Sequence, residues 1–205
     1  MKTLFLCSYF AEVRPLFEKF AEQYELEKKV LFIPTAGNVE EYTAYIDEGR
    51  AVFEELQFDV DLVDIAEETE TVVREKLAQA SCLYISGGNT FYLLQELKRK
   101  NLLPLIYERI NQGMVYVGES AGAIIASNDI SYSQIMDDKS LASDLTDYIA
   151  LGLVDFSVLP HWGEFPFEEI TEQTVAVYEG QLKLLKLTNQ QAVLVNDNKY
   201  TVENN

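Results

Sequence analysis

The order of short apolar runs and longer amphipathic segments limits the fold of this chain more than any other feature. Apolar runs of strand length lie at residues 4–9, 30–34, 81–86 and 114–117, and residues 59–65 alternate polar and apolar side chains, as a half-exposed strand does. Segments with one apolar and one charged helical face separate them, at residues 13–24, 40–56, 68–79, 91–100 and 104–112. Strands alternating with helices of this length predict an α/β fold, a three-layer αβα sandwich whose mostly parallel sheet is covered on both faces.

The C-terminal part of the chain follows a different pattern. Residues 182–187, 192–195 and 200–202 are short strand-like runs, and Asn-rich turns separate them. This pattern predicts a terminal antiparallel meander. Because the sequence contains no internal repeat, linker or low-complexity tract, we expect residues 1–205 to form one domain.

Charge and cysteine content narrow the function classes. The formal net charge of −18 excludes nucleic acid as an expected partner, since phosphate binding needs concentrated Lys and Arg. No apolar segment is long enough to span a membrane, and the apolar run at the N-terminus favours a first strand over a signal peptide. Cys7 and Cys82 lie in strand-like runs, which indicates two buried free thiols and a cytoplasmic location.

A serine between two glycines follows the strand-like run at residues 114–117. Gly118, Ser120 and Gly122 have the G-x-S-x-G spacing of a nucleophile elbow, in which a sharp turn exposes the serine hydroxyl above a sheet. Close packing of a helix on a sheet also selects small residues, so the spacing alone leaves both interpretations open. The apolar strand before Ser120 and the helix-compatible residues 121–126 after it favour the catalytic interpretation.

A serine hydroxyl needs a base to become a nucleophile, and the chain has one histidine, His161. It follows a strand-like run and Pro160. If an imidazole activates Ser120, His161 is that base; otherwise it is a hydrogen-bonded residue near a strand end. One histidine and two isolated cysteines make a metal site an unexpected feature.

The glycine-rich turn at residues 87–90 follows another predicted strand. Ligands of open parallel sheets bind beyond the carboxyl ends of the strands, so this turn and Ser120 are expected to face one crevice. One interpretation of this turn is a plain loop in which Asn89 or Thr90 caps the next helix. Alternatively, glycine leaves a backbone N–H open to a developing oxyanion, with the residue after the serine, Ala121, supplying a second N–H.

Three segments together resemble the peptidase E (aspartyl dipeptidase) family of serine peptidases. They are residues 85–94, residues 117–123 and residues 159–161, and the likeness extends from Leu4 to about Val195. The resemblance implies a class I glutamine amidotransferase-like, flavodoxin-like α/β fold, with serine in place of the amidotransferase cysteine. It also implies that no cofactor and no metal are needed.

The resemblance assigns roles to residues that match the family's motifs. Ser120 is the implied nucleophile and His161 the implied general base. Gly88 and Ala121 are the implied oxyanion donors, and Gly87 and Asn89 are expected to line the site. The implied reaction is acyl transfer: Ser120 attacks the scissile carbonyl, His161 moves the proton to the leaving amine, and water releases the acyl group.

The third catalytic residue departs from the family pattern. The family has a carboxylate in the late strand region, where the nearest match in this chain is Asn189. An amide can orient an imidazole but stabilises the imidazolium less. A second acidic position of the family, between the serine and the histidine, is matched by Asp137 or Asp138. These two aspartates can equally belong to a solvated acidic loop.

Substrate recognition departs from the family pattern as well. Recognition of an N-terminal aspartate needs a cation, yet residues 163–180 contain no Lys or Arg and several glutamates. We therefore predict a serine dipeptidase or exopeptidase that acts on short peptides or small amides, with weak or absent aspartyl specificity. The alternatives are a weakly active or inactive relative that binds a peptide or metabolite in the same crevice, and, less favoured, an amidotransferase-like subunit. The oligomeric state stays open, with a homodimer as the candidate assembly.

Overall fold

A seven-stranded sheet forms the centre of the computed structural model, which describes residues 2–205. Its strands are β1 (Thr3–Cys7), β2 (Lys29–Ile33), β3 (Asp59–Leu62), β4 (Cys82–Ile85), β5 (Val115–Glu119), β8 (Gln191–Asn196) and β9 (Lys199–Asn204). They lie in the order β3-β2-β4-β5-β1-β8-β9. Strands β1 to β5 are parallel, and β8 and β9 extend the sheet in antiparallel pairing beyond β1.

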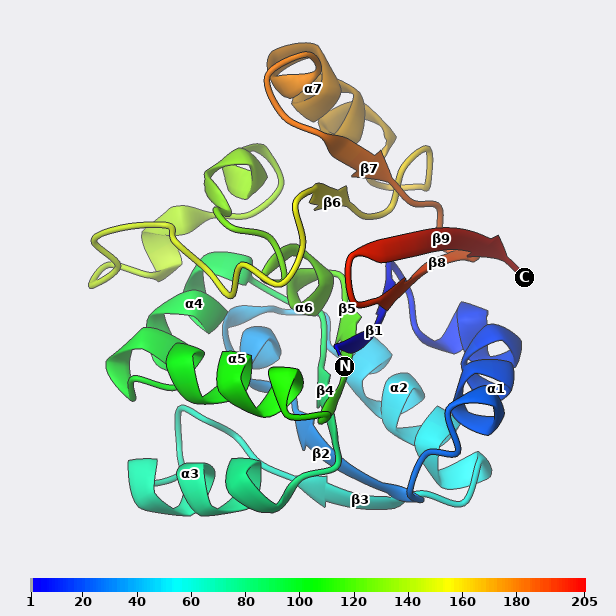
Figure 1. Cartoon of the computed structure of the whole chain (residues 1–205). Coiled ribbons are helices and arrows are strands. Elements are labelled where there is room, and N and C mark those ends of the chain that lie inside the picture. The colour runs from blue at the N-terminus through cyan, green and yellow to red at the C-terminus, as the bar shows by residue number, and fades with distance from the viewer. Residues whose placement is uncertain (1) are drawn as a thin grey trace.

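Helices cover both faces of this sheet (Figure 1). One face carries α1 (Arg14–Gln23) and α2 (Ala44–Glu55). The other carries α3 (Glu70–Gln79), α4 (Thr90–Arg99), α5 (Leu103–Asn111) and the short α6 (Ala121–Ile124).

Alternation along the strands builds the two cores. In β1, Leu4 and Leu6 point into the core beneath α3–α6, whereas Phe5 and Cys7 point into the core beneath α1 and α2. Successive strand residues face opposite sides, so a strand buried on both faces must be apolar throughout. The predicted α/β sandwich with a mostly parallel sheet is confirmed. No helix within residues 2–205 combines the length and apolar character needed to cross a bilayer.

The expected C-terminal meander is correct for its last two strands, and its first strand lies elsewhere. Strand β7 (Leu184–Lys186) pairs in parallel with β6 (Ser157–Leu159), in a separate two-stranded sheet. Helix α7 (Glu168–Tyr178) connects these two strands, above the main sheet in the view of Figure 1. A helix between two strands returns the second strand parallel to the first, so β7 completes a β–α–β unit instead of a meander. The sequence showed a strand-like run before Pro160, which contains β6, but the pattern does not show which strand it pairs with.

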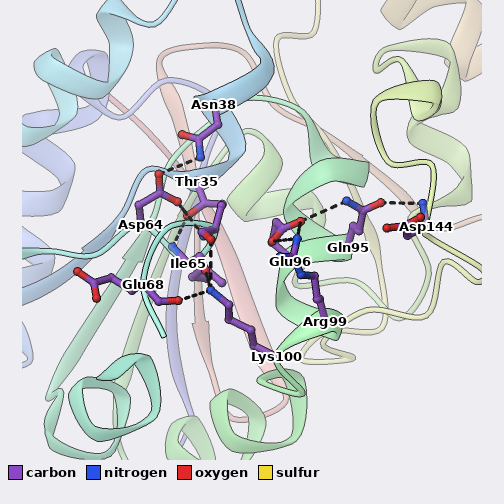
Figure 2. Close-up of polar contacts among 11 residues, drawn as sticks. Thr35, Asn38, Asp64, Ile65, Glu68, Gln95, Glu96, Arg99, Lys100 and Asp144 are labelled. Carbon is purple, nitrogen blue, oxygen red and sulfur yellow. Dashed lines mark hydrogen bonds and ion pairs between the residues drawn. The ribbon is translucent and has the colours of Figure 1, made fainter. Parts of the chain in front are cut away.

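A polar cluster holds the loops after β2 and β3 (Figure 2). The Thr35 hydroxyl donates to Asp64 Oδ1 at 2.8 Å and accepts the Ile65 N–H at 2.8 Å. Lys100, at the end of α4, donates to the carbonyls of Ile65 and Glu68. The loop after β2 contains a 3₁₀ turn at Thr35–Val39. The cluster therefore fixes this turn, which contacts the glycine-rich loop described next. Other 3₁₀ turns lie at Ala11–Val13, Ser131–Ile135 and Lys139–Leu141.

Candidate active site

Ser120 occupies the sharp turn between β5 and α6 in a strained backbone conformation. Its φ is 46° and its ψ is −105°, a region that costs a non-glycine residue on the order of 1–3 kcal/mol. The flanking glycines make the turn possible. A Cβ on Gly118 would lie 2.4 Å from the Gly122 carbonyl oxygen, and one on Gly122 would lie 2.2 Å from the Ile85 carbonyl oxygen. Close backbone approach therefore accounts for the G-x-S-x-G spacing.

His161 lies beside Ser120, although the two residues are 41 positions apart. His161 Nε2 is 2.9 Å from Ser120 Oγ. The backbone N–H of His161 donates to Ser8 Oγ at 3.1 Å, and Ser8 Oγ donates to the Leu187 carbonyl at 2.9 Å. Phe167 stacks on the imidazole with ring centroids 4.5 Å apart and an interplanar angle of 22°. The loops after β1, β6 and β7 thus fix both the backbone and the ring of His161.

Asn189 is the second partner of the imidazole. Its Oδ1 is 2.8 Å from His161 Nδ1, which places the proton on Nδ1 and leaves the Nε2 lone pair facing Ser120. Burial lowers the pKa of His161, and the hydrogen bond with Asn189 and the charge of Glu164 offset part of that shift. The ring is therefore neutral at pH 7, the form that can accept a proton from a hydroxyl.

The Gly87–Gly88 turn packs closely on the loop after β2. Gly88 has a φ of 126°, and a Cβ there would lie 2.3 Å from the Ala36 carbonyl, so only glycine fits. A Cβ on Gly87 would lie 3.3 Å from Ser120 Cβ, which places this turn directly beside the serine. Within residues 2–205, neither the Gly88 N–H nor the Ala121 N–H has a hydrogen-bond acceptor. Two donors are therefore available near the Ser120 hydroxyl.

The remaining predicted site residues cap helix α4 and its neighbouring loop. Asn89 Oδ1 accepts the Tyr92 N–H at 2.9 Å, and its Nδ2 donates to the Asp138 carbonyl at 3.1 Å. Asp137 accepts the Thr90 N–H at 3.1 Å, and burial raises its pKa to about 6. Asp138 is exposed and accepts the Ser140 N–H at 2.9 Å. The structure brings together Ser120, His161 and Asn189; it places both aspartates against other partners.

Two glutamates near the site were not singled out by sequence reasoning. Glu119 is 1% exposed and accepts three hydrogen bonds from neighbouring loops and strands. The sequence offered one signal for it, a charged residue that ends an otherwise apolar strand. Glu164, one of the glutamates within residues 163–180, accepts the Asn189 N–H at 3.1 Å. No group of three or more His, Cys, Asp or Glu side chains within residues 2–205 is arranged to hold a metal ion.

Comparison with known proteins gives relatives named as peptidases, and two of those described here cover 95% or more of this chain. An uncharacterised peptidase of Listeria monocytogenes is 46% identical over 195 residues, 95% of each protein. An uncharacterised peptidase of Pasteurella multocida is 42% identical over 205 residues, 100% of this chain and 99% of the relative. Peptidase E of a Nostoc strain is 30% identical over 135 residues, 66% of this chain and 52% of the relative.

Solved structures show the same likeness. A crystal structure of a candidate peptidase E from Listeria monocytogenes has a TM-score of 0.94 at 43% identity, covering 100% of this chain and 98% of that one. A peptidase from an acI-B1 Actinobacterium has a TM-score of 0.72 at 18% identity, covering 100% and 88%, and shares the fold.

The family itself follows from these matches, and the resemblance found in the sequence is confirmed. The sequence model of Peptidase family S51 matches residues 4–203, nearly the whole chain. The chain is therefore a peptidase, and it belongs to peptidase family S51.

Proposed function

We propose that this chain is a serine exopeptidase that hydrolyses short peptides through an acyl-enzyme on Ser120. The observation that carries the proposal is the 2.9 Å contact between Ser120 Oγ and His161 Nε2 in a strained turn. His161 takes the hydroxyl proton as Ser120 attacks the scissile carbonyl, and then donates it to the leaving amine. A water molecule, deprotonated by the same imidazole, hydrolyses the ester.

Backbone amides are proposed to stabilise the tetrahedral intermediate. The N–H groups of Gly88 and Ala121 lack acceptors within residues 2–205 and flank Ser120, so both can donate to the oxyanion. Fixed donors of this kind each contribute roughly a hundredfold or more to kcat. Asn189 is proposed as the third member, holding the Nδ1–H tautomer of His161.

The proposed substrate preference follows from the charges beside the serine. The Tyr45 ring lies next to the Gly87 turn. Burial raises the pKa of Tyr45 most, and the negative charges of Glu40, Glu119 and Asp137 raise it further. Lys186 lies 4.8 Å from the Trp162 ring centroid, but its Nζ is paired with Glu179 at 2.8 Å. An aspartyl side chain would therefore meet negative charge, so we propose weak or absent aspartyl specificity.

Substrates that differ only at the N-terminal residue test this preference. We expect alanyl-leucine and lysyl-leucine to be cleaved with higher kcat/KM than aspartyl-leucine. A strong preference for aspartyl-leucine would refute the proposed specificity while leaving the serine mechanism intact.

A second candidate function is a weakly active or inactive relative that binds a peptide in the same crevice. The observation that favours it is the amide of Asn189, which stabilises an imidazolium less than a carboxylate does. Labelling with a fluorophosphonate probe separates the two functions, because only an activated serine reacts. We expect labelling of the native chain, none with Ser120→Ala, a strong reduction with Asn189→Ala and near-native labelling with Asp137→Asn. An unlabelled native chain would favour the binding function.

We also propose a cytoplasmic location and a single domain. Cys7 and Cys82 are both free and buried, which supports a reducing, cytoplasmic location. The large sheet includes strands from Thr3 to Asn204, which supports one domain over residues 1–205.

A further inference from the structure

Glu119 joins three parts of the sheet at the edge where the candidate active site lies. It ends β5, directly before Ser120, and β5 lies between β4 and β1. Its Oε1 accepts the N–H of Phe10, after β1, at 2.7 Å. Its Oε2 accepts the Tyr84 hydroxyl of β4 at 2.6 Å and the Gly87 N–H at 3.4 Å. One buried carboxylate thus connects the loops on both sides of the serine.

The bond to Gly87 restricts the amide planes of the glycine turn. The Gly87 N–H donates to Glu119, and the Asn89 N–H donates to the Ala36 carbonyl at 2.9 Å. Of these three consecutive amides, only that of Gly88 lacks an acceptor within residues 2–205. Because both neighbours are fixed, the Gly88 N–H keeps one orientation, which is the condition for a preorganised oxyanion donor.

We infer that Glu119 is a positioning residue: its carboxylate fixes the Gly87–Gly88 turn for oxyanion stabilisation, and protonation of that carboxylate releases the turn. The inference rests on the proposed serine mechanism for its effect on rate. The contact that it invokes, between Glu119 and the Gly87 amide, exists independently of the mechanism.

The surroundings of Glu119 make its protonation accessible near neutral pH. The titratable groups that face it are Cys7 of β1, Tyr84 of β4, and Tyr45 and Glu48 of α2, none of them cationic. Burial raises the pKa of Glu119 to about 7, although the hydrogen bonds from Tyr84, Phe10 and Gly87 lower it. A proton on Oε2 turns an acceptor into a donor. The Tyr84 hydroxyl can rotate to accept that proton, but the Gly87 N–H can only donate and loses its partner.

Two substitutions separate this role from a merely structural one. Glu119→Gln keeps the shape but replaces one oxygen by an NH₂ donor, so it mimics the protonated state. We expect kcat to fall about tenfold to a hundredfold with little change in KM, and the acid limb due to Glu119 to disappear from the pH profile. Tyr84→Phe removes a donor that lowers the Glu119 pKa, so the acid limb should move to higher pH.

A matched control is Tyr132→Phe. Tyr132 is also fully buried, and its hydroxyl donates to the Val158 carbonyl at 2.6 Å, away from Glu119. This variant loses a comparable buried hydrogen bond and should keep the native pH profile. If Tyr84→Phe and Tyr132→Phe have the same profile, or if Glu119→Gln keeps native kcat and its acid limb, the inference is wrong.

A readout without substrate distinguishes failure of this inference from failure of the serine mechanism. In ¹⁵N-labelled native protein, the Gly87 amide resonance should titrate with the Glu119 carboxyl and should stop titrating in folded Glu119→Gln. If Ser120 does not react with the fluorophosphonate probe but the Gly87 amide titrates, the serine mechanism is refuted and the contact between Glu119 and Gly87 is supported. A Gly87 resonance that does not respond to pH in the native chain would refute the proposed control of the Gly87 amide by the Glu119 carboxylate.

Discussion

At the scale of single residues, the imidazole of His161 contacts an amide in place of the carboxylate of a usual serine-peptidase triad, and the nearby carboxylate of Glu164 lies behind that amide. Asn189 accepts from Nδ1, and the carboxylate of Glu164 accepts the backbone N–H of Asn189 at 3.1 Å. The negative charge is therefore one residue further from the imidazole than in an aspartate-based triad. Its effect persists in direction, because the charge of Glu164 raises the pKa of His161 against the larger effect of burial.

Removal of this charge should shift the titration of His161. In Glu164→Gln, which still offers an acceptor to Asn189, we expect the His161 pKa to fall further. Neutral imidazole is the active base, so the corresponding acid limb of kcat/KM should move to lower pH, with a few-fold loss of kcat. The chain has one histidine, so NMR titration follows its ring without ambiguity. Glu168→Gln, on the exposed first turn of α7, is the control and should change neither value.

At the scale of secondary-structure elements, the short helix α6 lies unusually close to the sheet. The Tyr116 hydroxyl donates to the Gly122 carbonyl at 2.6 Å, and Gly122 approaches the backbone of Ile85 in β4. The position of α6 sets the direction of the Ala121 N–H, one of the proposed oxyanion donors. Packing of this element and the proposed chemistry therefore depend on the same glycine.

A methyl group at this position should separate the helix from the sheet. We expect Gly122→Ala to lower the free energy of unfolding by about 1–3 kcal/mol, because the added carbon meets backbone that cannot rotate away. It should also lower kcat at least tenfold, since the Ala121 N–H moves. Gly113→Ala is the comparison, with a φ of 110° but no atom within 4 Å of the added Cβ. It should cost stability through backbone strain and leave kcat of the folded protein unchanged; equal kcat values for both variants would contradict the expectation.

At the scale of the whole molecule, negative charge sets how stability depends on pH. The formal net charge is −18, and the surroundings of Glu119 and Asp137 raise the pKa of both carboxyl groups. Burial raises the pKa of Glu119 from 4.5 to about 7 and that of Asp137 from 3.8 to about 6. A carboxyl with a raised pKa binds its proton more readily in the folded chain. The resulting stabilisation is complete below the unfolded pKa and is lost as pH rises through the folded pKa.

Stability should therefore increase as the pH falls from about 7.5 to about 5. The neutral imidazole of His161 opposes this trend, because its lowered pKa delays protonation in the folded chain. We expect a net gain on the order of 2 kcal/mol in the free energy of unfolding, measured by urea denaturation at each pH. The double variant Glu119→Gln/Asp137→Asn should lose the gain. Without these two carboxyl groups, the effect of His161 remains, so the double variant should become less stable as the pH falls. The same loss of stability in the native chain would contradict the raised pKa values of Glu119 and Asp137.

The sequence by itself determined the features that depend on neighbours along the chain. Strand and helix periodicity identified β1 to β5 and α1 to α5 to within a few residues, because burial repeats every two residues in a strand and about every 3.6 in a helix. The motif around Ser120 was equally local, since the glycines at positions 118 and 122 act on the turn that contains them. A single histidine left one candidate for the base.

Only the tertiary structure decided which distant polar groups meet. Asn189, 28 positions from His161, contacts Nδ1, whereas Asp137 contacts the start of α4. Glu119 meets Phe10 across 109 positions, and β7 pairs with β6 instead of joining the C-terminal hairpin. Periodicity reports whether a side chain is buried, and it says nothing about its partner. The partner of a buried polar group is set by strand order and by the paths of loops, which depend on contacts made throughout the folded chain.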